Sequence, residues 1–542
     1  MKAFLPSSPR GHILITSRAQ NFDMLGIPRA FHLQELPSDE ALEFCLKRTG
    51  RRNTSIEERQ AAETLAEKLG WLPLALEQAG AYIAVHQARF DDYLRSFEKR
   101  QLELLEAAPP VTGDYPSSVA TTWSLNFEEI EQVSMVSADL LRLSAFLGPD
   151  SVPLDLVQQG ASETGPALSA ALAQVREDPV AIHTLLEPLT RYSIVRRDIE
   201  SNTYSVHPLV QEVIRAAMDE ETCRVWTERV ERMLLKVSKV RWKENLPLRL
   251  LPLIPHLQAV ADAAKYREDE QVGNLYEALS NSHYQLEMHE EALSYSERAL
   301  AISEQLLDPE HPTTLMRREN HGVFLKNAGD LDGALSIFRE LLKSSKRVLD
   351  YQHPNIASIH NNIGSALREK GVSQEDTSFF AKTLSHYQRA LKIRQKKLGD
   401  HASTAESLHN MGALLMDMNR YDEARPCLEQ ALEMNQRVRG PMYGRNTGIL
   451  KRLGIVLKAQ GDYDGARASY EQELKVRKRA FGLEHPETVR TLYDLVDVLT
   501  EHGPYEAALQ YLEQELAACE TTVGEHHPYT DLVRQLLNDL TA

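Results

Sequence analysis

Cysteine and long apolar stretches are both scarce in this 542-residue chain. The four cysteines, none of them near another in sequence, are Cys45, Cys223, Cys427 and Cys519. Zinc sites and disulfide frameworks use closely spaced cysteines, so neither is expected here, and the composition suits a reducing compartment. No stretch approaches the roughly 20 apolar residues of a membrane-spanning helix, and the first residues lack the apolar core of a signal peptide. We therefore expect a cytoplasmic protein that does not act at a membrane.

Positive charge is in deficit as well. The chain has 61 Lys and Arg residues against 78 Asp and Glu residues, which gives a formal net charge of −17. Nucleic acids and anionic membranes bind proteins that present a basic surface, so this balance argues against both as partners. The length of the chain indicates two to four domains.

A phosphate-binding loop of the type G-x-x-x-x-G-K-[ST] is absent from the sequence, and no acidic strand comes before residue 12. These two elements hold the phosphates and the Mg²⁺ of a bound nucleotide. No nucleophile paired with a base and no cluster of metal ligands stands out elsewhere. We expect a chain that is not an enzyme, has no metal site and by itself needs no cofactor.

The second half of the chain contains a repeat of 42 residues. Successive markers of this repeat are 42 residues apart, apart from a polar insertion of six residues near Ser373–Ser378. A period of this length indicates stacked supersecondary units. The six markers are His311-Pro312, His353-Pro354, Asp400-His401, Tyr443-Gly444, His485-Pro486 and His527-Pro528.

Small residues recur at two phases of the period, and small side chains let two antiparallel helices approach closely. Each period is therefore predicted to form a helix, a turn and a second helix. Residues 274–540 should form six hairpins and a terminal helix, and the insertion should lengthen the turn of the third hairpin. The small residues are Ser280, Gly322, Gly364, Gly412, Gly454 and Val496 in the first helices, and Ala292, Ala334, Thr383, Ala424, Ala466 and Ala508 in the second.

The His-Pro steps are predicted to separate one hairpin from the next. A residue before proline is kept out of the α conformation, and proline itself suits the first turn of a helix. We assign these histidines a structural role in preference to metal binding or catalysis. Upstream of the repeats, the leucine-rich segment Glu244–Tyr266 is expected to form a helix that closes the first end of the stack.

The segment FGLEHPETVRTLYDLVDVLTEHGPYEAALQYLEQEL resembles the 42-residue tetratricopeptide repeat of kinesin light chains. The resemblance extends from about Asn274 to the C-terminus. It implies a superhelical stack whose concave groove binds a protein or peptide.

The first 240 residues lack the period and are predicted to form different domains. Residues 11–18 have the pattern of a buried parallel strand. Helices are expected over Ser38–Arg48, with Ser38 as the N-cap, and over Ile56–Leu69 and from Pro73 to Ala84. Helices followed by β-rich segments at 192–198 and 203–206 outline a winged helix.

Three short motifs in this half resemble the latter part of NB-ARC-type STAND ATPases. They are Thr16-Ser17-Arg18 after the strand, the Gly70 to Pro73 segment, and His207 at the end of the winged helix. In that family the corresponding residues face the γ-phosphate, the adenine and the β-phosphate of the nucleotide. The resemblance implies a remnant site for ADP or ATP in a longer form of the protein that supplies the phosphate loop, and possible oligomerisation of that form.

The predicted fold is mainly α. Residues 1–34 would be the remnant of a nucleotide-binding α/β domain, 35–110 a helical domain, 111–240 a winged-helix-like domain, 241–273 a linker with a capping helix, and 274–542 the tetratricopeptide array. The leading functional hypothesis is a protein-interaction scaffold, the regulatory and sensor portion of an NB-ARC–tetratricopeptide signalling protein. The alternatives are a nucleotide-dependent switch that binds ADP and a cargo adaptor similar to kinesin light chains.

The groove is predicted at the position two residues before the small residue of each first helix. Asparagine at this position can bond the backbone of an extended peptide, and nearby basic side chains would favour an acidic ligand. Alternatively, the asparagines only bond neighbouring helices to each other. The predicted groove residues are Asn320, Asn362, Asn410 and Arg452, with Lys326, Arg368 and Lys451 nearby.

Overall fold

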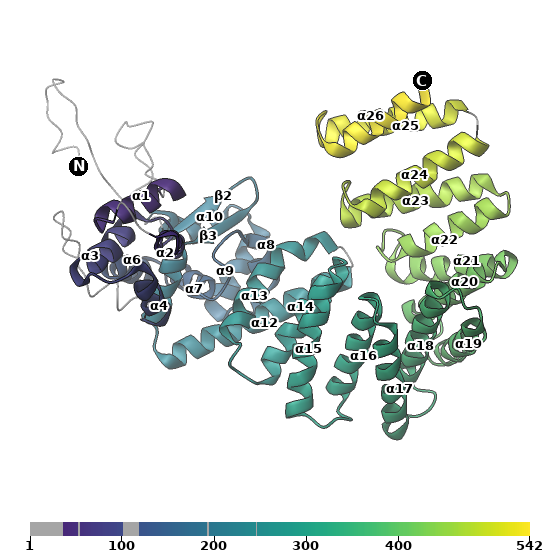
Figure 1. Cartoon of the computed structure of the whole chain (residues 1–542), viewed down its shortest axis with the longest axis horizontal. Helices are drawn as coiled ribbons and strands as arrows, with labels where there is room; N and C mark the ends of the chain where they lie inside the picture. Colours follow the sequence, from purple (N-terminus) through teal and green to yellow (C-terminus); the bar gives the residue numbers. More distant parts are fainter. Residues whose placement is uncertain are drawn as a thin grey trace. The chain divides into compact units, whose positions relative to one another are not determined.

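The computed structural model describes residues 36–51, 55–100, 119–191, 194–244, 247–503 and 505–541 (Figure 1). The chain divides into two compact units. The first comprises the residues up to Val237 together with Pro255–Ala263, and the second comprises Ser238–Ile254 and Ala264–Ala542. The predicted strand at 11–18, which includes Thr16, Ser17 and Arg18, lies outside the described residues.

The first unit begins with four helices around a small core. This core includes the fully buried side chains of Leu65, Leu69, Leu76 and Ile83. The helices predicted here are confirmed, with a fourth helix in addition. The four are α1 (Ser38–Arg48), α2 (Ile56–Lys68), α3 (Pro73–His86) and α4 (Phe90–Arg100).

The prediction that Ser38 is the N-cap of α1 is wrong by one residue. Pro37, at φ −52° and ψ 147°, already has the non-helical conformation of an N-cap, so Ser38 becomes the first helical residue. A serine does cap α2, where the side chain of Ser55 accepts a hydrogen bond from the backbone N–H of Glu58.

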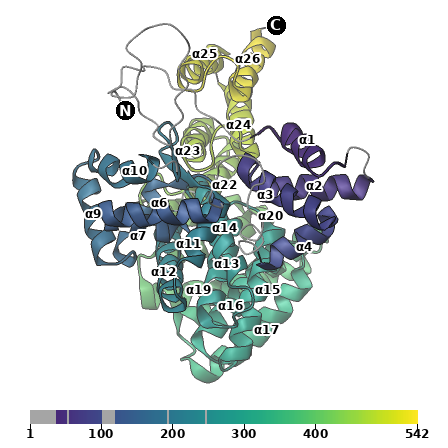
Figure 2. The ribbon, with the colours of Figure 1, turned by 90° about the vertical axis from the view of Figure 1, so that its left-hand side faces the viewer.

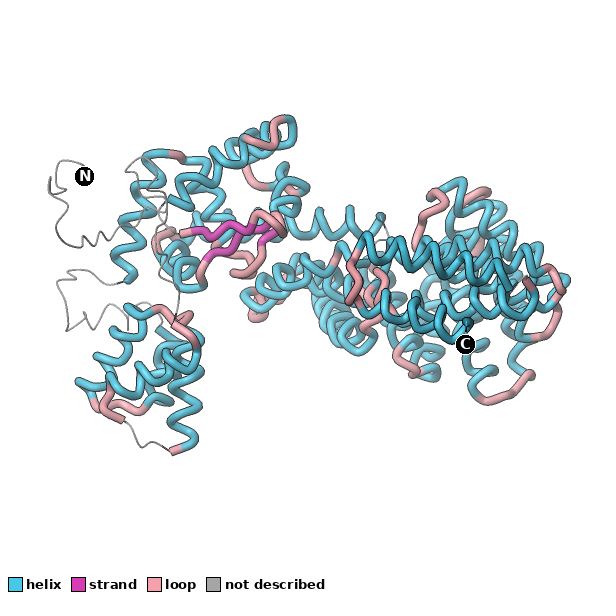
Figure 3. The backbone as a smooth tube through the Cα atoms, turned by 90° about the horizontal axis from the view of Figure 1, so that it is seen from above, coloured by secondary structure: helices cyan, strands magenta, loops and turns pink. Residues whose placement is uncertain are grey.

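The rest of the first unit is built from helices and a three-stranded antiparallel sheet. The sheet order is β1-β3-β2, and Val195 of β2 pairs with Val206 of β3 (Figure 3). Helix α7 packs against α6, α9 and α10 (Figure 2). The elements are α6 (Val119–Val133), α7 (Met135–Ser144), β1 (Val152–Pro153), α8 (Leu154–Gln159), α9 (Pro166–Glu177), α10 (Ala181–Arg191), β2 (Val195–Asp198), β3 (Thr203–Val206) and α11 (Pro208–Ala216).

The predicted β-hairpin is confirmed, and the sheet has a third strand that the sequence did not indicate. Strand β1 has only two residues, Val152 and Pro153, which is too short for an alternating pattern. Its partner residue Tyr204 is buried, and the Tyr204 hydroxyl lies 2.8 Å from that of Ser144 on α7. This hydrogen bond satisfies both buried hydroxyls and ties the sheet to the helices.

The segment expected to form a single capping helix is irregular instead. The long helix α12 (Glu220–Glu244) ends where the predicted helix should begin, and two 3-10 turns follow at Pro247–Arg249 and Leu251–Leu253. Only α13 (Ile254–Ala263) is regular, and most of it belongs to the first unit. Prolines at 247, 252 and 255 explain the difference, because each removes a backbone donor that a continuous helix would need.

The second unit is a stack of six helical hairpins and a terminal helix, as predicted. Each helix packs on the next in sequence order (Figure 1). The hairpins are α14 (Glu270–Gln285) with α15 (His289–Leu306), α16 (Pro312–Asn327) with α17 (Leu331–Val348), α18 (Pro354–Ser373) with α19 (Ser378–Leu398), α20 (Ala402–Asp417) with α21 (Tyr421–Arg439), α22 (Asn446–Ala459) with α23 (Tyr463–Phe481), and α24 (Pro486–His502) with α25 (Tyr505–Thr522), followed by α26 (Pro528–Thr541).

The glycines of the first helices admit a large side chain from the second helix of the same hairpin. A Cβ atom on Gly364 would come within 2.5 Å of the Tyr387 ring, and one on Gly454 within 2.7 Å of the Tyr470 ring. Gly322 and Gly412 face Phe338 and Leu428 in the same way. The sequence-based explanation of these small residues is confirmed, and the repeat period thus encodes a repeated close contact.

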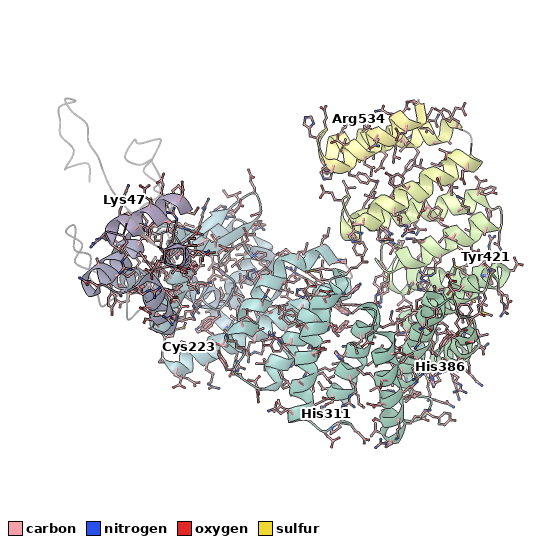
Figure 4. All side chains as sticks on the ribbon, in the orientation of Figure 1. Lys47, Cys223, His311, His386, Tyr421 and Arg534 are labelled. Carbon is pink, nitrogen blue, oxygen red and sulfur yellow. The ribbon has the colours of Figure 1, made fainter. Side chains whose placement is uncertain are left out.

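The histidines at these helix starts also cap the helices, a role that the sequence analysis did not predict. In each case the imidazole Nδ1 accepts a hydrogen bond from the backbone N–H two residues later, so histidine is the side-chain N-cap (Figure 4 labels His311). The proline effect and the cap act together at one step. The capping bonds are 3.2 Å for His207, His311, His353 and His527, 3.1 Å for His401 and 3.3 Å for His485.

The six-residue insertion extends helices more than it extends the turn, contrary to prediction. Helix α18 has 20 residues where α16 and α20 have 16, and α19 has 21 where α17 has 18. The turn between them, residues 374–377, is one residue longer than the turn of the preceding hairpin. Most of the inserted residues can adopt helical geometry, so continuing a formed helix satisfies their backbone groups.

Candidate functional site

A cavity of about 620 Å³ lies within the second unit. Its walls come from parts of the array that are distant in sequence: the segment with Trp242 and Pro247, the turn between α14 and α15, the starts of α20 and α22, and the ends of α16, α21 and α23. The first and fifth hairpins both contribute to this cavity, and the upstream turn η4 (Pro247–Arg249) packs on α23 of the fifth. The aromatic side chains that line the cavity are Trp242, Tyr284, Tyr443 and Phe481.

The cavity lies at two of the three hairpin starts that lack a His-Pro step, those of α20 and α22. His401-Ala402 keeps the histidine without the proline, and Tyr443-Gly444 keeps neither. All four of these residues line the cavity. At the second start, α22 has Arg445 at its N-cap position and no side-chain capping bond.

Two arginines line the cavity on either side of Tyr443. The Arg439 guanidinium lies 5.8 Å from the centroid of the Tyr443 ring, and Arg445 follows that tyrosine by two residues. Both residues are exposed, and among the described residues no carboxylate lies within 4.0 Å of either guanidinium. Arg445 still has negative charge nearby: burial lowers its pKa, but Tyr443 and Glu406 raise it overall. The acidic lining residues already have partners: Glu406 lies 3.3 Å from Arg394, and Glu287 lies 3.8 Å from His485.

Buried amide groups also line the cavity. Asn435 is 5% exposed and its Oδ1 has no hydrogen-bond partner, and Gln285 is 8% exposed with an unpaired Oε1. The Gln285 Nε2 group donates to the Trp242 carbonyl at 3.3 Å. An unsatisfied buried acceptor costs about 1–3 kcal/mol, so a ligand that donates to these oxygens would recover that free energy. Asn327 and Asn410 add two further amides to the lining.

His409 contributes a neutral imidazole to the cavity wall. Its Nε2 atom lies 3.2 Å from a guanidinium nitrogen of Arg452, which can only donate, so Nε2 accepts and Nδ1 carries the proton. Burial, together with the charges of Arg452 and Arg368, lowers the pKa of His409 to about 3. The imidazole is therefore uncharged at physiological pH.

Most of the predicted groove residues belong to a set of contacts between the first helices of neighbouring hairpins, here called the interhelical ladder. Asn362 on α18 donates to Glu319 on α16 at 2.9 Å, and Arg452 on α22 bonds to His409 on α20. The basic residues are paired in the same way. The ladder pairs are Lys326–Glu369 at 2.6 Å, Arg368–Asp417 at 2.5 and 3.2 Å, and Lys451–Glu487 at 2.8 Å.

Of the four residues predicted to bind peptide backbone, Asn410 alone lines the cavity among the described residues. Asn362 makes the interhelical bond that was the alternative interpretation, and Asn320 is half-buried. Peptide binding by the predicted set remains a prediction. Sequence reasoning missed Gln285, Asn435, Arg439 and Arg445, although the irregular Tyr443-Gly444 step was a visible signal beside the last two.

Two of the three nucleotide-related motifs meet in the first unit. Gly70 has φ +62°, and a Cβ atom there would lie 1.9 Å from Nε2 of His207, so only glycine fits against this imidazole. Pro73 is the first residue of α3 and its side chain is exposed. Thr16, Ser17 and Arg18 lie outside the described residues, so the structure does not place the third motif.

The described residues contain neither a metal-binding cluster nor a membrane-spanning helix. No three His, Cys, Asp or Glu side chains in the described ranges come together as they would around a metal ion. None of the described helices combines the length and apolar character needed to cross a membrane.

Comparison with known proteins identifies the repeats. Models of the tetratricopeptide repeat match residues 272–313, 314–355, 371–437 and 447–521. A model described as a domain of unknown function (DUF7779) matches residues 128–223, across the sheet and its helices.

A nucleotide-binding leucine-rich repeat (NLR)-like protein from Hyaloscypha variabilis is 26% identical over 329 residues, which cover 58% of this chain. The chain spans only about a third of that relative, since the match covers 31% of its length.

Among solved structures, a STAND protein with a tetratricopeptide repeat sensor from Pyrococcus horikoshii has a TM-score of 0.40 and 11% identity, covering 96% of this chain and 87% of that one. A putative kinesin light chain with nearly identical TPR-like repeats from Podospora anserina has a TM-score of 0.30 and 19% identity, covering 38% of this chain and 93% of that one. The repeat models confirm the tetratricopeptide resemblance of the second half, and part of the chain is similar to an NLR-like protein.

Proposed function

We propose that the tetratricopeptide array binds a segment of polypeptide in the cavity between its first and fifth hairpins. The observation that carries this proposal is the set of unpaired, buried amide oxygens on Asn435 and Gln285 in a cavity with aromatic walls. A peptide backbone offers N–H donors at regular spacing, and aromatic rings accept its apolar side chains. The cavity volume, about 620 Å³, falls within the roughly 300–1,000 Å³ of ligand pockets.

The interhelical ladder supports the same location by contrast. Its asparagine and basic side chains are engaged within the array, so they would have to break existing bonds to hold a ligand. The cavity amides require no such exchange. Binding at the cavity is therefore favoured over binding along the ladder.

In this proposal the chain is the ligand-recognising portion of a signalling protein. The relationship to an NLR-like protein supports a sensor role, and repeat arrays of this kind supply binding surfaces without chemistry of their own. The matched segment is a minor part of that relative, so a longer protein would supply the response that follows recognition.

The test is selection of peptides from a random library on the purified chain, followed by affinity measurement on variants. Asn410→Ala combined with Asn435→Ala should weaken binding of the selected peptides at least tenfold. Lys392→Ala, on an exposed position of α19, is the control and should leave affinity unchanged. The proposal fails if the library yields no binder, or if the double variant binds as the unaltered chain does.

A second candidate, an ADP-binding switch, is favoured by the contact between Gly70 and His207. This contact joins two of the three motifs that resemble the NB-ARC nucleotide site. In this reading, ADP binding would need the phosphate loop of a longer form. Calorimetric titration of that form with ADP, with and without His207→Ala, tests it; equal affinities would remove the candidate.

A further inference from the structure

Basic side chains gather on α17 and α19, the second helices of two neighbouring hairpins. Helix α19 has six Lys and Arg residues and no Asp or Glu among its 21 residues. Eight cations of the two helices are exposed, and among the described residues no carboxylate forms an ion pair with any of them. These eight, here called the basic face, are Arg339, Lys343 and Lys346 on α17 and Lys382, Arg389, Lys392, Lys396 and Lys397 on α19.

The cations of the two helices lie close to one another. His386, on α19, responds to both sets, because burial and then the positive charges of Arg389, Arg339 and Lys346 lower its pKa (Figure 4 labels His386). Arg389 belongs to the same helix as His386, and the other two cations belong to α17. The basic face therefore forms one surface across two hairpins, although the whole chain has a net charge of −17.

Exposed apolar side chains lie beside these cations at the end of α17. Tyr351 is 70% exposed and Val348 is 47% exposed. The Tyr351 hydroxyl accepts a hydrogen bond from Nε2 of Gln352 at 2.8 Å, and Oε1 of Gln352 accepts one from Nζ of Lys396 at 2.8 Å. These two bonds hold the tyrosine beside a cation of α19 while most of its surface stays exposed.

Helix geometry alone does not explain this arrangement. Cations in the last turn interact favourably with the helix dipole, which accounts for Lys346, Lys396 and Lys397. Arg339 and Lys382 lie more than two turns before the helix ends, where the dipole has little effect. On the two helices and the turns beside them, the described acidic residues without an ion pair are half as many as the cations: Glu340, Asp350, Glu375 and Asp376.

We propose that the basic face and the neighbouring Tyr351 and Val348 dock the array on the surface of a bilayer that contains anionic phospholipid. Lysine and arginine are attracted to the negative potential of such a surface, and their long side chains reach the headgroup phosphates. Tyrosine settles at the level of the headgroups, and a neighbouring apolar side chain enters the boundary of the acyl region. A nucleic-acid backbone would attract the same cations but offers nothing to Val348, so the apolar pair favours the bilayer.

This docking surface is separate from the cavity and does not depend on peptide binding there. The sequence-based expectation that the protein does not act at a membrane followed from the net charge and from the lack of long apolar stretches. Neither property describes a local surface, because peripheral binding needs only a patch of cations and a few apolar side chains.

The test is co-sedimentation of the purified full chain with vesicles of equal parts phosphatidylserine and phosphatidylcholine. The chain should bind these vesicles and should bind vesicles of phosphatidylcholine alone at least tenfold more weakly. Equal binding to both, or binding to neither, would overturn the proposal.

Two matched pairs of variants locate the cations that bind. Lys346→Gln combined with Lys397→Gln should weaken binding to the mixed vesicles at least tenfold. The control is Lys475→Gln combined with Arg479→Gln, which removes the same charge from exposed positions of α23, two hairpins beyond α19. This control should change the affinity less than about threefold, because screening confines the attraction to about 10 Å. Equal losses in both pairs would mean that net charge, and not the basic face, governs binding.

The apolar side chains distinguish a bilayer from a soluble polyanion. Val348→Ser combined with Tyr351→Ser should weaken vesicle binding at least fivefold and should leave binding of double-stranded DNA unchanged. The matched control is Ile455→Ser combined with Tyr493→Ser, whose side chains are 40% and 47% exposed, and it should bind vesicles like the unaltered chain. If the Val348 and Tyr351 variant binds vesicles normally while DNA displaces the chain from them, the partner is a nucleic acid and the bilayer proposal is wrong.

Discussion

The interhelical ladder and the cavity are made from the same repeat, yet they treat polar side chains in opposite ways. Along the ladder, Asn362, Lys326 and Arg368 each meet a partner on the neighbouring hairpin. In the cavity, Asn435 keeps an unpaired oxygen and Arg439 keeps an unpaired charge relative to the described residues. The same repeat therefore produces polar side chains that bond neighbouring hairpins and polar side chains that have no partner among the described residues.

The largest expected effect is the loss of stability when a buried ion pair of the array is broken. Glu473 has no exposed side-chain surface, and Arg477 lies 2.7 Å from it. Arg477→Met would leave the glutamate buried without its cation, at a cost of about 3–5 kcal/mol. Urea unfolding followed by circular dichroism measures this loss. The added change Glu473→Gln should recover part of the loss, and a loss below about 1 kcal/mol would show that the pair does not stabilise the array.

The next effect concerns Glu319, the ladder partner of Asn362. Burial raises the pKa of Glu319 to about 7, well above that of the unfolded chain. The folded array then binds more protons than the unfolded chain between about pH 4.5 and 7, so its stability falls as the pH rises through this window. Glu319→Gln removes the titrating group, so the free energy of unfolding of the unaltered chain should fall by about 3 kcal/mol relative to this variant as the pH rises from 4.5 to above 7. Parallel stability curves for the two proteins from pH 4.5 to 8 would contradict it.

A smaller effect distinguishes two helical glycines. Gly364→Ala should cost about 1–3 kcal/mol, because the added methyl group would lie 2.5 Å from the buried Tyr387 ring. Gly448→Ala, beside the cavity, meets its nearest neighbour at 3.5 Å and should gain up to about 1 kcal/mol from helix propensity. Thermal unfolding of both variants gives the comparison. Equal shifts in Tm would show that the close contact is not specific to the regular repeats.

Removing the N-cap side chain should destabilise a regular repeat more than it destabilises the helix start beside the cavity. His353→Ala removes the acceptor for the Asn355 N–H and should cost about 1 kcal/mol. Arg445→Ala, at the corresponding end of α22, has no capping bond to lose and should leave the stability of the array nearly unchanged. Unfolding curves in urea measure both. The first N–H groups of α22, those of Asn446 and Thr447, donate to backbone carbonyls of residues 443 and 444. A cost at Arg445 equal to that at His353 would show that the Arg445 side chain also stabilises this helix start.

The smallest effect on stability is expected at the cavity amide. Asn435→Ala removes an unpaired buried oxygen, which favours folding, and also removes packed side-chain atoms, which opposes it. The two effects should nearly cancel, so the free energy of unfolding should change by less than about 1 kcal/mol. The same change should weaken peptide binding about tenfold, which corresponds to about 1.4 kcal/mol. Paired unfolding and calorimetric titration experiments test this. A large loss of stability would show that Asn435 stabilises the stack, as the residues of the interhelical ladder do.

The hairpins could be predicted from sequence because their information is local. The small residues, the turns and the His-Pro steps recur within each 42 residues, and each hairpin contacts mainly its neighbours. The capping bond of histidine escaped prediction because the proline offered a sufficient reason for the same helix start. The insertion was misplaced because periodicity counts residues without showing whether they extend a helix or a turn.

The cavity could not be predicted because it depends on the accumulated rotation of several hairpins. Gln285 and Asn435 are 150 positions apart, and no local pattern indicates that they line one space. A local signal existed only for Arg439 and Arg445, beside the irregular Tyr443-Gly444 step. Asn362 and Arg452, chosen because they recur with the repeat, were placed in the ladder for that same reason.

The most direct test of the central claim is hydrogen exchange of the array with and without a selected peptide. The account predicts slower exchange on binding at the starts of α20 and α22 and near the end of α21, which line the cavity. The middle of α16 and α18, which are joined by the Asn362–Glu319 hydrogen bond of the interhelical ladder, should exchange at the same rate with and without the peptide. Protection confined to α16 and α18, with none at the start of α22, would contradict it.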